Sequence, residues 1–94
     1  AVCAGGSTMW EMACMGTPFI PIVIAENQRQ AAMAMAGDGY PAIEAAAIER
    51  ELPAVVAALA ADAGRRETLS RRGRRLVDGR GAERVCAALR ELAR

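Results

Sequence analysis

Short apolar runs alternate with mixed segments along the first half of the chain, and their spacing predicts strands separated by helices. The run at residues 1–4 ends at a glycine pair, as a buried parallel strand would. The β-branched run at 19–24 predicts a second strand, and 40–43 predicts a shorter third one. Helices are predicted over residues 8–15 and 27–36, each followed by a glycine. This order indicates a parallel sheet with helices packed on it.

Prolines and glycines set the limits of other elements. Pro21 removes a hydrogen-bond donor from the second strand, which favours an irregular start or a position at the sheet edge. Pro53 suits the first turn of a helix that continues to about residue 61. Gly64 or its neighbours then separate that helix from another over about residues 65–77.

A final helix is predicted over about residues 82–93, after the glycine-rich turn at 78–81. Val85, Leu89 and Leu92 fall on one apolar stripe of this helix. The sequence contains no internal repeat and no flexible linker. A length of 94 residues therefore indicates one small α/β domain, or a piece of a larger one, with a sheet of about three strands.

Composition narrows the possible functions. Of the 94 residues, 22 are alanine and three are aromatic, so the expected core is thin. Because the chain has no histidine, it cannot form a Ser-His-Asp triad, a Cys-His pair or a histidine-bearing metal site by itself. No carboxylate cluster suited to a metal is visible either. We therefore expect neither a metal nor a cofactor.

The cysteines and the apolar runs bear on the compartment. Cys3, Cys14 and Cys86 lack CxxC spacing, which predicts buried thiols in a reducing cytoplasm. The longest apolar stretches are far shorter than the roughly 20 residues that a membrane helix needs, and no signal peptide is visible. We expect a cytoplasmic protein without a membrane span.

Charge is distributed unevenly. Residues 1–64 carry two basic and seven acidic groups, whereas residues 65–94 carry ten arginines and four acidic groups. Nucleic-acid binding would favour a clustered basic patch with aromatic groups between the charges, and neither is present in the predicted helix at 65–77. The sequence favours a solvated helix face with no nucleic-acid partner, and an Arg-rich interaction module is the alternative.

The first candidate site is the strand-to-helix junction Gly5-Gly6-Ser7-Thr8. A helix N-terminus offers unpaired N–H groups and a partial positive charge, both of which favour phosphate. Glycines let a ligand approach the backbone, and the two hydroxyl groups add donors. The junction matches neither the P-loop nor the GxGxxG pattern, so an ordinary tight turn is the alternative.

Further candidates follow this junction and the second strand. Glu11 lies three residues after Thr8, as in a helix capping box; alternatively, its carboxylate accepts two hydroxyl groups of a sugar. Asn27 and Gln30 form a similar helix-start pattern. Gln28 has no such structural role, and an amide at the carboxyl end of a strand suits a hydroxyl-rich ligand.

Four segments, taken in order, resemble one family. They are residues 4–11, 16–18, 26–28 and 78–85. Together they resemble the C-terminal domain of GT-B-fold nucleotide-sugar enzymes. The resemblance is closest to the UDP-sugar hydrolases of pseudaminic acid biosynthesis and their spore-coat polysaccharide relatives. The glycosyltransferase that adds N-acetylglucosamine to lipid I is more distant.

The resemblance implies a Rossmann-like domain, of which this chain is the latter part, with a UDP-sugar bound against a separate N-terminal domain. The turn at residues 5–8 matches the family's diphosphate-binding turn, and Glu11 matches the glutamate that binds the ribose hydroxyl groups. Asn27 and Gln28 match the amides that approach the sugar. The turn at residues 78–82 is expected only to position the last helix.

The resemblance also places the proposed catalytic base, a histidine, in the N-terminal domain, so no catalytic residue is expected here. An apolar run at residues 1–4 agrees with a preceding segment, because a domain rarely begins inside its own core. The implied reaction is attack of water at the anomeric carbon with release of UDP, and this chain would stabilise the departing diphosphate. Hydrolase and glycosyltransferase both remain open, because the residues that separate them lie upstream.

Overall fold

The computed structural model describes residues 1–93 and confirms a mixed α/β arrangement. Three short parallel strands, β1 (Val2–Ala4), β2 (Ile20–Val23) and β3 (Ile43–Glu44), form a sheet in the order β1-β2-β3. Helix α1 (Ser7–Met15) connects β1 to β2, and α2 (Glu26–Gly37) connects β2 to β3. The strands therefore all end at one side of the sheet, here called the carboxyl edge, and begin at the other, the amino edge.

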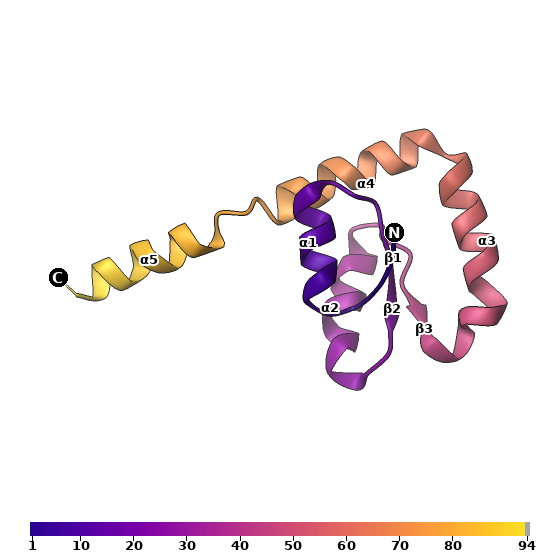
Figure 1. Cartoon of the computed structure of the whole chain (residues 1–94), viewed down its shortest axis with the longest axis horizontal. Helices are drawn as coiled ribbons and strands as arrows, with labels where there is room; N and C mark the ends of the chain where they lie inside the picture. The colour runs from indigo at the N-terminus through magenta and orange to yellow at the C-terminus, as the bar shows by residue number, and fades with distance from the viewer. Residues whose placement is uncertain (94) are drawn as a thin grey trace.

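The second half of the described chain is helical. A short 3₁₀ turn, η1 (Ala45–Ala47), leads into α3 (Ile48–Ala61), α4 (Ala63–Leu76) and α5 (Gly81–Leu92). In Figure 1 the sheet stands between α1 and α2 on one side and α3 on the other. Helix α4 runs across the amino edge, past the ends of α1, α2 and α3, and α5 extends away from them.

Pro21 lies in the central strand of the sheet, so the prediction of an edge position is wrong. Ile20 N donates to Ala1 O at 2.8 Å, and successive residues of a strand point their backbone groups to opposite sides. The nitrogen of Pro21 therefore faces the β3 side, where pairing starts only with Ile22 and Ile43. The missing donor lies just before that ladder begins, which is why the proline is tolerated.

Helix α3 begins earlier than its proline predicted. Pro53 lies inside the helix, which starts at Ile48, rather than in its first turn. Ile48 and Leu52 pack against the buried core, and this contact extends the helix backward past the position that local sequence preference favours. The tertiary contact outweighs the loss of one helical N–H donor.

The break between α3 and α4 lies at Asp62, in the predicted region but not at the glycine itself. Gly64 lies within the first turn of α4 instead of separating the two helices. Asp62 forms the break, because its side chain accepts a hydrogen bond from Arg65 N at 2.9 Å and so caps α4. Aspartate is among the most favourable residues at this position.

The core lies between the sheet, the inner faces of α1 and α2, and α4. Its larger buried side chains are Met9, Phe19, Ile22, Met35, Tyr40, Ile43 and Leu69. The Tyr40 ring stacks on Phe19 with centroids 4.2 Å apart, and its hydroxyl donates to Leu69 O at 2.6 Å. Because Tyr40 turns into the core, the third strand begins at Ile43 instead of residue 40.

Helix α4 contacts α1 closely through a glycine. A Cβ atom at Gly73 would lie 2.8 Å from Ala13 O and 2.6 Å from Tyr40 Oη, both too short for a real contact. Gly73 is therefore required for this contact between the helices, and its backbone is buried there.

Arginines of α4 lie at the C-terminal ends of α1, α2 and α3. Arg66 Nη1 donates to Leu59 O at 2.9 Å in the last turn of α3, and Arg72 Nη1 donates to Asp38 O at 2.8 Å just after α2. The Arg74 side chain lies beside the glycine that caps α1. Helix C-termini carry partial negative charge, so these positions stabilise the attachment of α4.

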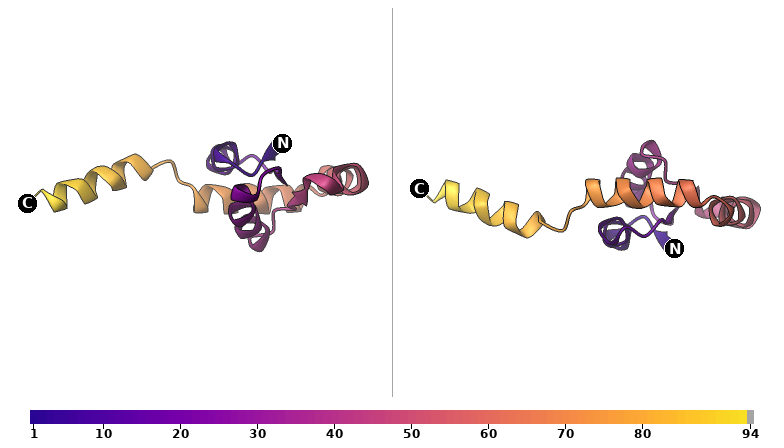
Figure 2. Two further views of the ribbon diagram at one scale, coloured as in Figure 1. Left: turned by 90° about the horizontal axis from the view of Figure 1, so that it is seen from below. Right: turned by 90° about the horizontal axis from the view of Figure 1, so that it is seen from above.

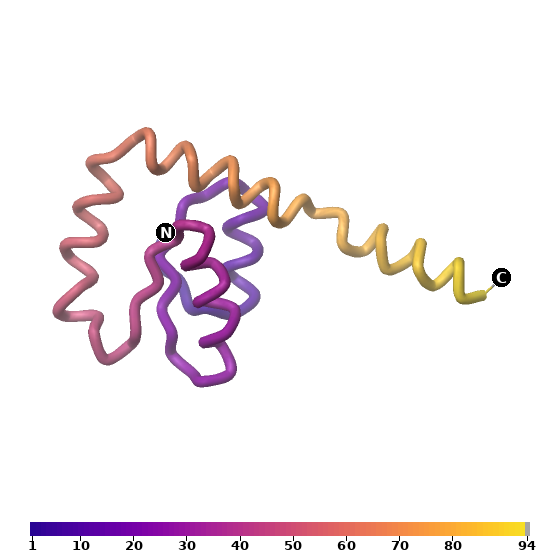
Figure 3. The backbone as a smooth tube through the Cα atoms, turned by 180° about the vertical axis from the view of Figure 1, so that it is seen from behind, coloured from indigo at the N-terminus to yellow at the C-terminus, as the bar shows by residue number. Residues whose placement is uncertain are grey.

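Helix α5 is exposed along its whole length and lies apart from the body in both perpendicular views (Figure 2) and in the view from behind (Figure 3). Val85, Leu89 and Leu92 are 60%, 59% and 83% exposed, so the predicted apolar stripe has no partner within residues 1–93. Asp78 accepts a hydrogen bond from Arg80 N at 3.0 Å in the turn before α5.

The cysteines depart from the prediction of buried thiols. Cys86 lies on α5 and is exposed, while Cys3 and Cys14 are half-buried. Burial raises the pKa of the Cys3 thiol. The prediction fails for Cys86 because it lies on α5, whose residues are all exposed.

Candidate functional site

At the carboxyl edge, the junction at residues 5–8 lies beside the first turn of α2. Gly5 N donates to Ile22 O at 3.0 Å, which is the last bond from this segment to β2. Gly6 then precedes the first helical residue of α1, and Ser7 and Thr8 are exposed in the first helical turn. The N-terminus of α1 thus opens at the edge where ligands of parallel α/β sheets bind.

The glycine pair allows α2 to approach this junction. A Cβ atom at Gly5 would lie 3.2 Å from Ala32 Cβ, and one at Gly6 would lie 3.4 Å from Gln28 Nε2. Gln28 and Ala32 are four residues apart and share one face of α2, which therefore packs on the β1–α1 turn. The structure thus brings Gly5, Gly6 and Gln28 together from separate parts of the sequence.

The Gln28 side chain has an unused hydrogen-bonding group. Its Oε1 atom is buried, and no group within residues 1–93 donates a hydrogen bond to it. A buried amide oxygen without a donor is unfavourable, so such an atom is usually satisfied by water or by a ligand. The Gln28 amide therefore lies beside the Gly5–Gly6 turn with an oxygen that the described chain leaves unsatisfied.

Neither predicted helix cap is formed. The residue before α1 is Gly6 and the residue before α2 is Ala25, and neither helix has a side-chain hydrogen bond from this position. Both helices start one residue earlier than the sequence pattern predicted, which moves Thr8 and Asn27 into the second helical position. The capping interpretation is wrong for both pairs, and the side chains of Thr8, Glu11 and Asn27 are exposed.

Glu11 lies one turn further along α1 than the junction. Its side chain is exposed, as is that of Asn27 on the first turn of α2. The structure therefore places Glu11 and Asn27 on the two helices that begin at the carboxyl edge, each open to solvent. Of the predicted site residues, the contacts join Gln28 to the glycine pair, and Glu11 stands apart from them.

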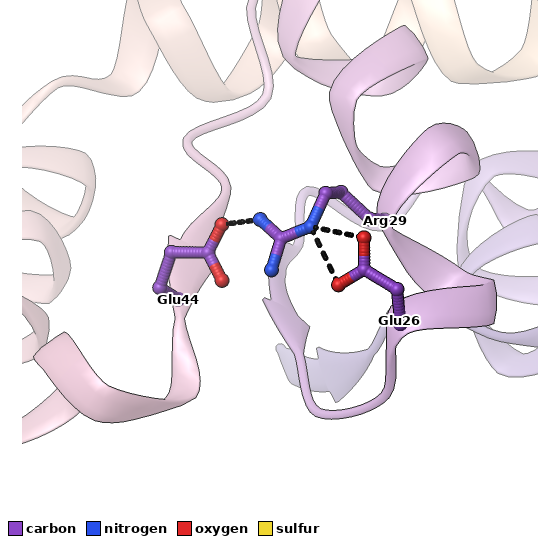
Figure 4. A network of polar contacts seen from close by, with 3 residues as sticks. All are labelled: Glu26, Arg29 and Glu44. Carbon is purple, nitrogen blue, oxygen red and sulfur yellow. Dashed lines mark hydrogen bonds and ion pairs between the residues drawn. The ribbon is translucent and has the colours of Figure 1, made fainter.

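A network of charged side chains at the same edge was not predicted. Arg29 Nε donates to Glu26 Oε1 and Oε2 at 3.2 Å and 3.0 Å, and its Nη1 donates to Glu44 Oε1 (Figure 4). The hydrogen bonds that Arg29 donates to Glu44, and then those it donates to Glu26, raise the pKa of Arg29. The i,i+3 spacing of Glu26 and Arg29 was visible in the sequence, but Glu44 was not, because the predicted third strand ended before it.

The amino edge differs from the carboxyl edge in chemistry. It carries the α4 arginines described above and an apolar hollow of about 280 Å³ between the sheet, α3 and α4. Pro18, Ile20 and Val56 are among the residues that line the hollow. The Arg-rich helix and the candidate site therefore lie on opposite sides of the sheet.

In the part of the chain that the structure describes, no group of three or more His, Cys, Asp or Glu side chains is placed to hold a metal ion. Over the same residues, every helix is too short or too polar to cross a bilayer. No family model, no curated protein and no solved structure matches the chain.

Proposed function

We propose that this chain binds a UDP-sugar at its carboxyl edge, as the latter part of the Rossmann-like C-terminal domain of a GT-B-type enzyme. One observation carries the proposal. Gln28 lies against the Gly5–Gly6 turn, with its amide oxygen buried and without a donor among residues 1–93. The resemblance assigns these two segments to neighbouring parts of one ligand, and they are far apart in the sequence.

In this proposal each group has a separate role. The diphosphate lies at the first turn of α1, where backbone N–H groups and the hydroxyl groups of Ser7 and Thr8 are donors. Glu11, an exposed carboxylate on the next turn, accepts hydrogen bonds from the ribose hydroxyl groups. Asn27 and Gln28 meet the sugar with amides that both donate and accept.

The proposed chemical contribution is stabilisation of the leaving group. When the bond between the anomeric carbon and the diphosphate oxygen breaks, the electron pair stays on that oxygen and negative charge grows there. The partial positive charge at the start of α1 favours this change. Arg29 already has two carboxylate partners, so the helix end, not this arginine, faces the diphosphate.

The proposed whole-protein activity is hydrolysis of a UDP-sugar in surface polysaccharide or pseudaminic acid biosynthesis. A glycosyltransferase is the alternative, and in both cases this chain binds the same diphosphate. The base that activates the attacking water comes from a preceding domain of the same polypeptide. The chain alone is expected to bind UDP weakly and to turn nothing over.

The Arg-rich interaction module gains no support from the structure. Arg66, Arg72 and Arg74 lie against the ends of neighbouring helices, which gives them a structural role. They also lie on a different edge from the uncapped N-terminus of α1.

Calorimetric titration with UDP tests the proposal through one matched pair of variants. Glu11→Gln is expected to weaken binding about tenfold, because hydrogen bonds to a charged acceptor contribute about 1.5–3 kcal/mol. Glu67→Gln makes the same chemical change on α4, at the amino edge, and is expected to leave binding unchanged. Circular dichroism of both variants checks that they remain folded.

Two results would contradict the proposed site. One is equal loss of affinity in Glu11→Gln and Glu67→Gln, which would indicate a non-specific charge effect. The other is the lack of any UDP binding by the folded wild-type chain at millimolar ligand.

A further inference from the structure

The ion pair between Arg29 and Glu44 joins two elements of the carboxyl edge. Arg29 belongs to the first turns of α2, and Glu44 is the last residue of β3, paired in register with Val23 at the end of β2. Both side chains are about half-exposed, at 42% and 43%. The other partner of Arg29, Glu26, is 82% exposed and belongs to α2 itself. Of the two ion pairs of Arg29, the one with Glu44 therefore connects α2 to another element, the strand β3.

The first turn of α2 is held from two sides. Consecutive helical residues point about 100° apart, so Gln28 and Arg29 face different directions. Gln28 packs on the glycine turn that follows β1. Arg29 reaches in another direction, to the end of β3, as Figure 4 shows. The position of this helical turn over the sheet thus depends on contacts with both outer strands.

The orientation of Gln28 depends on that position. No group in the described chain donates a hydrogen bond to its Oε1 atom, so polar contacts to this oxygen do not fix the amide. Its placement follows from the backbone of α2 and from packing against the turn at Gly6. A small shift of a ligand-binding group can weaken binding without unfolding the protein.

We infer that Glu44, through Arg29, is a positioning residue for the sugar-binding end of the site. It acts by holding the α2 turn that carries Asn27 and Gln28, and it does not touch the ligand. The inference rests on the proposed function and adds a residue that the resemblance does not assign. It also explains why a carboxylate at the end of β3 is paired across the sheet edge with α2.

The test compares UDP with UDP-N-acetylglucosamine in calorimetric titrations of the full chain. Glu44→Gln is expected to weaken binding of the UDP-sugar about three- to tenfold and binding of UDP less than twofold, because the diphosphate end lies on α1. Glu26→Gln removes the other carboxylate from Arg29 but no link between elements, so both affinities should stay within twofold. Glu51→Gln, which alters an exposed ion pair on α3, is the surface control.

Arg29→Lys is the conservative variant, because it keeps a positive charge that reaches Glu44. It should retain more UDP-sugar affinity than Arg29→Ala. Hydrogen exchange of the second-turn amides of α2, which donate to carbonyls of the first turn, gives a second measurement without ligand, and it should speed up in Glu44→Gln more than in Glu26→Gln. A half-exposed ion pair contributes little to global stability, so the melting temperature should change little in either variant.

The outcomes separate the two proposals. If wild type binds both ligands and Glu44→Gln behaves like Glu26→Gln, the positioning role is wrong and the proposed function stands. An equal loss for UDP and the UDP-sugar in Glu44→Gln would likewise overturn the positioning role. If wild type binds neither ligand, the proposed function is wrong and the inference is lost with it.

Discussion

At the scale of single residues, glycines allow the close contacts on which this fold depends. Gly5 and Gly6 let α2 lie against the β1–α1 turn, and Gly73 lets α4 lie against α1. Gly37, by contrast, has open space where a Cβ atom would stand. The effect of adding one methyl group should therefore depend strongly on position.

Gly73→Ala is expected to lower the free energy of unfolding by about 1–3 kcal/mol, the usual cost of overpacking. The new methyl group would overlap Ala13 O and the Tyr40 hydroxyl, so the Tyr40–Leu69 hydrogen bond would be disturbed as well. Gly37→Ala is the matched control and should be neutral or stabilising by up to about 1 kcal/mol. Urea denaturation of the two variants measures both changes, and similar stabilities would contradict this account of the α1–α4 contact.

At the scale of elements, the sequence predicted the order of strands and helices but not several of their limits. Apolar runs and the glycines that follow them were sufficient to predict the existence and order of β1, α1, β2 and α2. The limits of α3 and β3 depended on long-range packing, because Ile48 and Tyr40 contact a core formed by distant residues. Pro21 was misplaced for a similar reason, since the partner of a strand cannot be read from that strand alone.

In the candidate site, too, some features could be predicted from local sequence and others depended on long-range contacts. The junction at residues 5–8 was visible because glycines and hydroxyl residues follow an apolar run. The contact of Gln28 with that junction needed the parallel pairing of β1 and β2, and the Arg29–Glu44 pair needed the position of β3. The local sequence pattern predicted side-chain caps that do not form, because the residue before each helix lies two positions earlier than the cap that the pattern indicates.

Helix α4 gives a prediction at this scale. Arg72→Ala should destabilise the protein by about 1–2 kcal/mol, because Arg72 bonds to the carbonyl of Asp38 at the C-terminal end of α2. Arg71→Ala removes an exposed pair with Glu67 on the same helix and should cost about 0.5 kcal/mol or less. Thermal unfolding at low and at high salt measures the difference. Equal effects would show that the contact with the end of α2 does not stabilise α4.

At the scale of the whole molecule, the chain forms a packed body and one separate helix. The body comprises the sheet with α1 to α4, while α5 is exposed on every residue from 81 to 92. The two edges of the sheet also differ. At the amino edge the α4 arginines bond to the ends of neighbouring helices, and at the carboxyl edge the candidate site opens to solvent. Stability and proposed ligand binding thus depend on different sides of the sheet.

Backbone amides of α5 are expected to exchange with solvent much faster than those of α1 and β2. A helix of about 12 residues is marginal in water without tertiary contacts, and α5 has exposed apolar side chains in place of such contacts. Hydrogen exchange followed by mass spectrometry on dilute protein measures this by segment. Protection of α5 equal to that of β2 would contradict the prediction and indicate a covering partner.

The exposure of Cys86 has a practical consequence. Its sulfur is on α5, beyond the amino edge, whereas Cys3 and Cys14 are half-buried in the body. A maleimide dye or a sensor-chip tether should therefore attach selectively at Cys86. Such a label would lie on the helix that extends away from the body, so that small ligands could be screened against an oriented, immobilised layer of the protein.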